Sequence, residues 1–350
     1  MNPPPIPAAP VTIGLLGASD RARWDGFVDA CPQATFFHRA GWQRVIEQAF
    51  GHATWFLYTE AGGAIRGVLP LAQVRSRWFG NTLCSLPFCV YGGIAAQDQA
   101  AADALDRAAQ SLAARLRVDH LEYRHLHASH QDWLHKSLYC TFRKPLLPTV
   151  EQNLLAIPRK QRAMVRKGMA TGLRSVMDID SDRFHALYAS SVHRLGTPVF
   201  SPGYFRLLQE EFGRDCEILC VEHQGQAVCG VLSFRFRGEI LPYYGGGGAS
   251  ARALAGNDFM YWEVMRRACE RGCTLFDFGR SKLGTGAYDF KKNWGFAPQP
   301  LEYEYQLHRA SRLSDHQPLN PRYRLMIKLW QRLPLAVANM LGPHLIRQLG

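Results

Sequence analysis

The feature of this sequence that most constrains its fold is an internal repeat. In each half, two apolar runs flank a short segment containing glycine. In the first half, the first apolar run is at 54–58, and the glycine-containing turn with the second run is at 62–69. In the second half, the corresponding ranges are 217–221 and 225–232. Apolar runs joined in this way are typical of β-hairpins. The 350-residue chain is therefore expected to form the same hairpin twice.

The repeat continues past the hairpins. Tyr91-Gly92-Gly93 in the first half matches Tyr244-Gly245-Gly246 in the second. Each is followed by a helical stretch and then by a short strand, at 101–116 and 120–123 in the first half and at 257–271 and 275–278 in the second. A helix placed between strands favours a mixed sheet with helices packed on it. We predict an α/β (α+β) chain built from two similar units, each with a mostly antiparallel sheet and flanking helices.

Composition sets the expected boundaries of these units. Pro145 and Pro148 mark the junction, and five prolines lie within the first ten residues. The predicted parts are a flexible tail at 1–10, a first domain at 11–148, a second domain at 149–308 and a basic, amphipathic tail at 309–350.

The positive charge of the chain is concentrated in two places. Lys and Arg number 41 against 29 acidic residues, a formal charge of +12. Residues 152–177 carry six basic side chains and no acidic one, and residues 309–350 carry seven against one. These two segments account for the whole surplus, which argues against a polycation that coats nucleic acid. Arg159, Arg162 and Arg166 share one face of a helix predicted at 158–171. This face suits tRNA, a nucleotide-sugar or an anionic lipid head group, or it is simply solvated.

The C-terminal tail has the pattern of an amphipathic helix. Tyr323, Met326, Ile327, Trp330 and Leu333 recur at helical spacing among Lys and Arg side chains. This pattern predicts contact of residues 320–350 with an anionic membrane surface, with packing onto the second unit as the alternative.

The remaining features indicate the cytoplasm. Nine cysteines without a Cys-x-x-Cys pair indicate reduced thiols, and neither a signal peptide nor an apolar run of spanning length is recognised. The expected location is therefore cytoplasmic, peripheral to the inner face of the membrane if the tail binds there. The oligomeric state is left open.

Three motifs in the second half resemble the signature of the FemAB-like family, whose members carry two folds related to the GCN5-like N-acetyltransferases. In order, they are Asp277-Phe278-Gly279-Arg280, Tyr288-x-Phe290-Lys291 and Trp294-Gly295-Phe296. The chain is also similar to a subgroup found with exosortase/PEP-CTERM gene clusters. Its hallmarks are matched at 35–38, 87–93, 157–162 and 195–198. The resemblance runs from about residue 10 to Gly350 and implies two tandem GCN5-like N-acyltransferase domains.

The resemblance also implies an activity, the transfer of an acyl or aminoacyl group onto an amine. FemAB proteins proper take amino acids from aminoacyl-tRNA and extend the peptide of a cell-wall precursor. The acceptor expected here is a small-molecule or lipid-linked amine of a cell-envelope or exopolysaccharide precursor. No tightly bound cofactor is expected, and the donor is an acyl-CoA or an aminoacyl-tRNA. The acetyl-CoA loop of ordinary GCN5-like enzymes has no convincing copy here, which leaves the donor open.

The family match places the catalytic charges around Lys291. Aminolysis requires the amine to lose a proton, donors for the tetrahedral oxyanion and charge compensation for the leaving group. Lys291 matches the family's lysine, which implies the last two roles. Its alternative is a solvated lysine on a strand edge, and which of Lys291 and Lys292 faces the cleft depends on register. Arg280 suits capture of phosphate or carboxylate, or a salt bridge with Asp277.

Further candidates line the predicted cleft, which is expected at the second unit and the domain junction. Tyr244 and the glycines after it are predicted to form a turn whose backbone N–H groups bind an oxyanion. Asn257 is a candidate ligand contact, with helix capping beside Asp258 as the alternative. The other substrate-binding candidates are Phe36, His38, Tyr91, Arg159, Arg162, Gly245, Gly246, Asp277 and Tyr288.

Two rival functions are kept, a degenerate fold that docks an anionic envelope component and an RNA-binding protein. No metal site is predicted: His125, His127 and His130 lack a carboxylate cluster in the sequence, and a surface loop is the expectation there.

Overall fold

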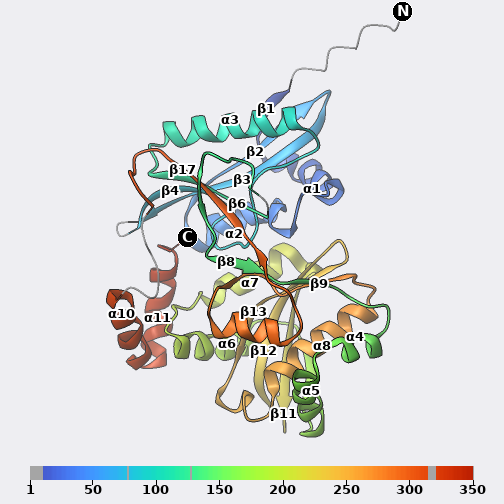
Figure 1. Ribbon diagram of the computed structural model, residues 1–350. Helices are drawn as coiled ribbons and strands as arrows, with labels where there is room; N and C mark the ends of the chain where they lie inside the picture. The colour runs from blue at the N-terminus through green and yellow to red at the C-terminus, as the bar shows by residue number, and fades with distance from the viewer. Residues whose placement is uncertain (1–10, 77–78, 127, 314–320, 350) are drawn as a thin grey trace, which may run out of the picture. The chain divides into compact units, whose positions relative to one another are not determined.

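The computed structural model describes residues 11–76, 79–126, 128–313 and 321–349, and the side chains of 321–324 are excluded. The tail predicted at 1–10 lies outside the described residues. The chain divides into two compact units, one of residues up to 135 with 302–313, the other of 136–301 with the residues after 313. Figure 1 labels many of their elements. No described helix has both the length and the apolar character needed to cross a bilayer.

The first unit is built on one mixed sheet. Its strand order is β1-β2-β3-β4-β6-β17-β7, with β5 paired to β3. The strands are β1 (Thr12–Leu15), β2 (Ala53–Ala61), β3 (Ala64–Ser76), β4 (Gly80–Ser85), β5 (Ala95–Ala96), β6 (His120–His125), β7 (Leu134–Lys136) and β17 (Glu302–Leu307). The helices are α1 (Arg21–Ala30), α2 (Gly41–Phe50) and α3 (Gln99–Arg115), with short 3-10 turns at Ala18–Asp20 and Phe36–His38.

The second unit repeats this plan. Its main sheet has the order β10-β11-β12-β13-β14-β9, and a small sheet has the order β15-β8-β16. The strands are β8 (Tyr139–Thr141), β9 (Arg143–Pro145), β10 (Arg174–Asp178), β11 (Cys216–His223), β12 (Gln226–Phe236), β13 (Glu239–Gly247), β14 (Leu275–Asp277), β15 (Ser281–Lys282) and β16 (Gln299–Pro300). The helices are α4 (Val150–Ala156), α5 (Arg159–Ala170), α6 (Asp182–Leu195), α7 (Pro202–Phe212), α8 (Gly256–Glu270), α9 (Gly286–Asn293), α10 (Pro321–Arg332) and α11 (Leu335–Ile346). Two 3-10 turns occupy Gly213–Asp215 and Ala249–Ala251.

The repeated hairpins follow from their turns. β2 and β3 are joined by Gly62 and Gly63, and β11 and β12 by Gln224 and Gly225, all four with positive φ. Two central residues with positive φ give the turn whose twist matches that of paired strands, and glycine adopts this conformation without strain. The internal repeat and the mixed α/β fold class predicted from the sequence are confirmed.

Each unit contains one parallel strand pair bridged by a helix. In the first unit β4 pairs with β6 in parallel, and α3 connects them. In the second unit β13 pairs with β14 in parallel, and α8 connects them. The inner faces of these helices are apolar: Leu105 and Leu112 of α3 and Trp262 and Met265 of α8 are buried in the core of their unit.

In each main sheet, the strand that pairs with the outer side of the parallel pair comes from across the expected junction. β17 follows the whole second unit in the chain but pairs antiparallel with β6. β9 precedes α4 and pairs antiparallel with β14. Each parallel pair is thereby covered on its outer edge, which satisfies backbone groups that a sheet edge would leave open.

Candidate functional site

Lys291 lies inside the second unit and not on a strand edge. It is on α9, a helix whose N-cap residue Thr285 accepts a hydrogen bond from the backbone N–H of Tyr288. Lys291 Nζ donates to the carbonyl oxygens of Phe278 (2.7 Å), Gly279 (3.0 Å) and Arg280 (3.1 Å). The strand-edge alternative is therefore wrong. Lys292, by contrast, is exposed and lies over the Tyr288 ring.

The burial of Lys291 changes its acidity. Desolvation, with a smaller effect of the Arg280 cation, lowers the pKa of Lys291 to about 8, while Asp277 and Cys140 oppose the shift. A three-carbonyl cage favours the ammonium because each N–H finds an acceptor. Lys291 is thus mostly protonated at pH 7 and is held in a fixed position, as a preorganised cation.

Asp277 organises the backbone around this lysine. It is fully buried at the end of β14 and accepts hydrogen bonds from Thr141 Oγ1 (3.2 Å) and from the Gly279 backbone N–H (2.7 Å). Its carboxylate also pairs with Arg143 Nε at 3.2 Å. Gly279 has φ +66°, a conformation that lets the chain turn back towards Lys291.

Two more predicted residues join the same cluster. The Arg280 guanidinium lies 4.6 Å from the centre of the Tyr139 ring. The Tyr288 ring meets Phe142 edge-on at 5.5 Å, and Lys291 Nζ lies 5.6 Å from the same phenylalanine. The structure therefore brings Lys291, Arg280, Asp277 and Tyr288 together around β8 and the start of α9.

Tyr244, Gly245 and Gly246 lie in strand β13, so the predicted turn is wrong. Residues 244–247 pair with β12, and the register shifts at Tyr243 as a β-bulge. Tyr244 is buried, and its hydroxyl lies 2.9 Å from that of Tyr204. The glycines serve close packing: a Cβ on Gly246 would stand 2.7 Å from the Tyr188 Cα.

Asn257 is not the cap of α8. The residue at the N-cap is Ala255, in the left-handed conformation, and no side chain caps the helix. Asn257 lies in the first turn of α8 and packs closely on Gly247: a Cβ added to Gly247 would be 3.0 Å from Asn257 Oδ1. Asp258 accepts from the Trp294 indole N–H (3.0 Å) and from Gln161, so it fastens α8 to α5 and α9.

The basic helix forms as predicted, as α5. Arg159 and Arg166 are exposed, whereas the Arg162 guanidinium donates to the Leu155 carbonyl oxygen at 2.6 Å. The three arginines form a basic surface, on which the Arg162 side chain points back towards α4.

In the first unit, two of the three predicted residues line one cavity. It measures about 630 Å³, and His38 and Tyr91 contribute to its wall. Phe36 is instead buried against Phe37 and Trp42 in the core. His38 Nδ1 accepts from the Thr35 N–H (3.0 Å), and Nε2 lies 3.2 Å from the Gly93 carbonyl oxygen. Both ring nitrogens are thus engaged, which holds the imidazole in a fixed orientation.

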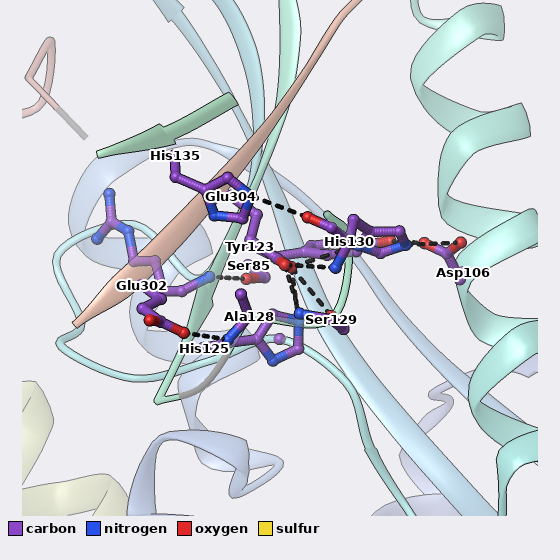
Figure 2. Close-up of polar contacts among 12 residues, drawn as sticks. Ser85, Asp106, Tyr123, His125, Ala128, Ser129, His130, His135, Glu302 and Glu304 are labelled. Carbon is purple, nitrogen blue, oxygen red and sulfur yellow. Dashed lines mark hydrogen bonds and ion pairs between the residues drawn. The ribbon is translucent and has the colours of Figure 1, made fainter. Parts of the chain in front are cut away.

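The same cavity contains a histidine and carboxylate cluster that the sequence did not reveal. His130 lies between Asp106 of α3 and Glu304 of β17. Its Nε2 is 3.3 Å from the Asp106 carboxylate, and its Nδ1 is 3.3 Å from the Glu304 carboxylate. Glu304 also accepts from the His130 N–H (2.7 Å) and from the hydroxyl and N–H of Ser129 (Figure 2). The surface loop expected for the histidines is wrong for His125 and His130, which are largely covered. His127 lies outside the described residues.

The two histidines differ sharply in acidity. Hydrogen bonds that His130 donates to Asp106 and Glu304 raise the pKa of His130 to about 9, whereas burial lowers the pKa of His125 to about 4. The pKa of Glu304 is lowered to about 2, chiefly because its hydrogen bonds to His130 outweigh burial. At pH 7 the cluster therefore holds a charged His130, a neutral His125 and two carboxylates. No group of three or more His, Cys, Asp or Glu among the described residues is arranged to hold a metal ion.

Comparison with known proteins agrees with this architecture. Residues 159–292 match the family model described as an acetyltransferase (GNAT) domain. No curated protein matches the sequence. Among solved structures, FemX is similar over 90% of this chain and all of its own, at 15% identity and a TM-score of 0.64. A tandem GNAT protein from the clavulanic acid biosynthesis pathway is similar over 85% of this chain and 98% of its own, at 15% identity and a TM-score of 0.52.

A third similar structure comes from Agrobacterium fabrum. It is the C-terminal domain of a protein described as a lysylphosphatidylglycerol synthetase, similar over 83% of this chain and 93% of its own, at 13% identity and a TM-score of 0.56. At these identities the similarity concerns the fold. The second unit thus carries a GNAT-type acetyltransferase domain, and the chain as a whole has the fold of tandem GNAT proteins and of FemX.

Proposed function

We propose that the protein is an acyltransferase that moves an acyl or aminoacyl group onto an amine. The observation that carries this proposal is the place of Lys291, which lies within the matched GNAT segment and is held as a preorganised cation by three carbonyl oxygens. In the reaction the amine nitrogen attacks the carbonyl carbon of the donor and loses a proton. The bond from that carbon to sulfur or oxygen then breaks, and the leaving group departs with the electron pair and takes up the proton that the amine has lost, as a thiol or an alcohol.

The Lys291 cluster suits this chemistry through charge. Negative charge develops first on the carbonyl oxygen and then on the leaving group, and a fixed cation in a poorly solvated site stabilises both. Arg280 supplies a second cation beside Lys291, suited to a phosphate of a CoA or tRNA donor. The acceptor we propose is an amine of a cell-envelope or exopolysaccharide precursor, small or lipid-linked.

The donor is identified by a thermal-shift screen of the full chain with acyl-CoAs, aminoacyl-tRNA and nucleotide-sugars. We expect a donor-dependent rise in melting temperature that Arg280→Ala abolishes. Arg237→Ala is the matched control, because Arg237 also lies over an aromatic ring, that of Phe236 at 4.5 Å. A shift with acyl-CoA alone identifies a CoA-dependent enzyme, and one with aminoacyl-tRNA alone identifies an aminoacyl transferase. Absence of any shift favours a docking protein without catalysis.

We also propose that the C-terminal helices touch an anionic membrane surface. The helix predicted in the tail divides its apolar residues between two faces. Ile327 packs on Gly196 next to α6, and the Trp330 carbonyl oxygen lies 3.1 Å from His193 Nε2. In contrast, Leu325, Met326 and Leu329 are 60%, 57% and 55% exposed.

Charge complementarity favours a lipid surface for the exposed face. Lys328 and Arg332 are exposed at positions that flank Leu325 and Leu329 on one side of the helix. Long basic side chains beside an apolar stripe reach phosphate groups while the stripe enters the acyl boundary. In this proposal, the face of α10 with Ile327 packs on the second unit, and the face with Leu325 and Leu329 contacts the membrane.

Vesicle co-sedimentation tests this contact. The wild type should bind vesicles of phosphatidylglycerol and phosphatidylcholine, and less in high salt because ions screen the basic side chains. Leu325→Ser with Leu329→Ser should lower binding at least about tenfold, since burying each leucine contributes roughly 1.5–3 kcal/mol. The control is Ile179→Ser, which removes an isolated apolar residue that is 97% exposed in the same unit. Equal loss in the control would contradict the proposal.

A further inference from the structure

The cavity of the first unit lies where parallel strands place ligand sites. β4 and β6 pair in parallel from Thr82↔His120 to Ser85↔Tyr123, where the pairing ends. Tyr91, which follows β4, and His125, the last residue of β6, line the cavity together with one face of α3. Ligands in open α/β sheets bind outside the carboxyl ends of such strands. At about 630 Å³ the cavity is large enough for a small organic molecule.

The charge of this cavity is opposite to that of the chain. Asp103 and Asp106 line it from α3, while none of the described lining residues is Lys or Arg, although the chain has 41 of these. The cation at the wall, His130, is already shared by Asp106 and Glu304. With Asp103 and Asp106 against His130, the residues that line the cavity leave one negative charge in excess.

A neutral polar atom accompanies these carboxylates. His125 lines the cavity, and its buried Nε2 has no hydrogen-bond partner among the described residues, with Glu304 Oε2 at 3.7 Å. The His125 ring packs directly against Gly93: a Cβ added to Gly93 would come within 2.5 Å of the imidazole. A buried polar atom without a partner costs stability unless a ligand or water pairs with it.

We propose that this cavity binds a small molecule carrying a protonated primary amine. The ammonium would pair with the carboxylates on α3, in the cavity that His125 also lines. Tyr91, Ile94 and Leu126 provide apolar wall for the body of the ligand. An anionic ligand is disfavoured because it would face the carboxylates of Asp103 and Asp106. The proposal does not depend on the transfer reaction, since these residues lie outside the matched segment 159–292.

Calorimetric titration of the full chain tests this inference with matched pairs of probes. The amines are D-glucosamine, cadaverine and lysine methyl ester, each compared with its fully N-acetylated counterpart, which carries no ammonium group. We expect at least one amine to bind at least tenfold more tightly than its counterpart. Equal affinity within every pair, no binding by any amine, or tighter binding of glucose 6-phosphate would overturn the proposal.

Two variants place the binding in this cavity. Asp103→Asn and His125→Phe should each weaken amine binding at least about fivefold. Asp103 is chosen over Asp106 because Asp106 also holds His130 and Tyr123. The control is Asp29→Asn, which removes an exposed carboxylate of α1 that is not part of the cavity wall. Unchanged affinity in both cavity variants, or equal loss in the control, would show that the amine binds elsewhere.

Discussion

Replacing Lys291 with methionine should lower the rate of acyl transfer by about 10²–10³, the usual loss when one preorganised charge-stabilising group is removed. Methionine keeps much of the length and apolar character of the side chain but carries no charge. Steady-state kinetics with the donor found in the binding screen measures the loss. The matched control is Lys292→Met, which removes the neighbouring exposed cation. Equal activity of the two variants would contradict the role of Lys291.

Methionine also leaves the carbonyl oxygens of residues 278–280 without their donor, so folding has to be separated from charge. Lys291→Arg does this through pH. Lysine is charged below its pKa, which is lowered to about 8 here, so wild-type activity that needs the cation should fall as pH rises through about 8. The guanidinium of arginine stays protonated well above this range. An active Lys291→Arg variant should therefore lack this decline, whereas one that keeps it would assign the decline to another group.

The local parts of the fold were predictable because their causes are local. The turns at Gly62-Gly63 and at Gln224-Gly225 lie between apolar runs, and both form hairpins. The basic helix was also expected, with Pro158 at its start, and α5 begins at Arg159. In these segments the backbone preferences and the apolar pattern agree, so sequence and tertiary structure point to the same element.

The glycines after Tyr244 show where local reasoning failed. Glycine-rich segments indicate turns, but residues 245–247 are extended and paired with β12. Their lack of side chains is explained by close contacts: Tyr188 of α6 lies against Gly246, and Ala251 lies against Gly247. Glycine selected for close approach is not distinguishable, in one sequence, from glycine selected for a turn.

The candidate sites were predictable only where a contiguous motif carried them. Lys291, Arg280, Asp277 and Tyr288 belong to one stretch of the sequence, and they lie together in the structure. The cluster in the first unit had no such signal, because Glu304 is 174 residues from His130 along the chain. It meets His130 since β17 pairs with β6, a long-range pairing that no periodicity in the sequence encodes.

That long-range contact leads to the largest stability effect we expect. Glu304→Gln should destabilise the first unit by about 3–5 kcal/mol, the usual cost of removing one partner from a buried ion pair. Its side chain is fully buried and accepts from Ser129 and His130, whose N–H groups would then face an amide with only one acceptor oxygen. Glu302→Gln is the matched control on the same strand: Glu302 is less buried and accepts from the Ala128 N–H. Hydrogen exchange of residues 128–136 and urea unfolding provide the measurements.

The pH dependence of this stability distinguishes an ion pair from simple packing. The pKa of Glu304 is lowered to about 2, so its contribution is present above the ordinary value of 4.5 and is lost as pH falls towards 2. The pKa of His130 is raised to about 9, so its contribution is complete below 6.5 and is lost as pH rises through 9. The difference in stability between the wild type and Glu304→Gln should therefore be greatest between about pH 4.5 and 6.5 and should shrink on both sides. A difference that does not vary with pH would mean that Glu304 acts by filling space, and the ion pair would then contribute nothing to holding the loop on β17.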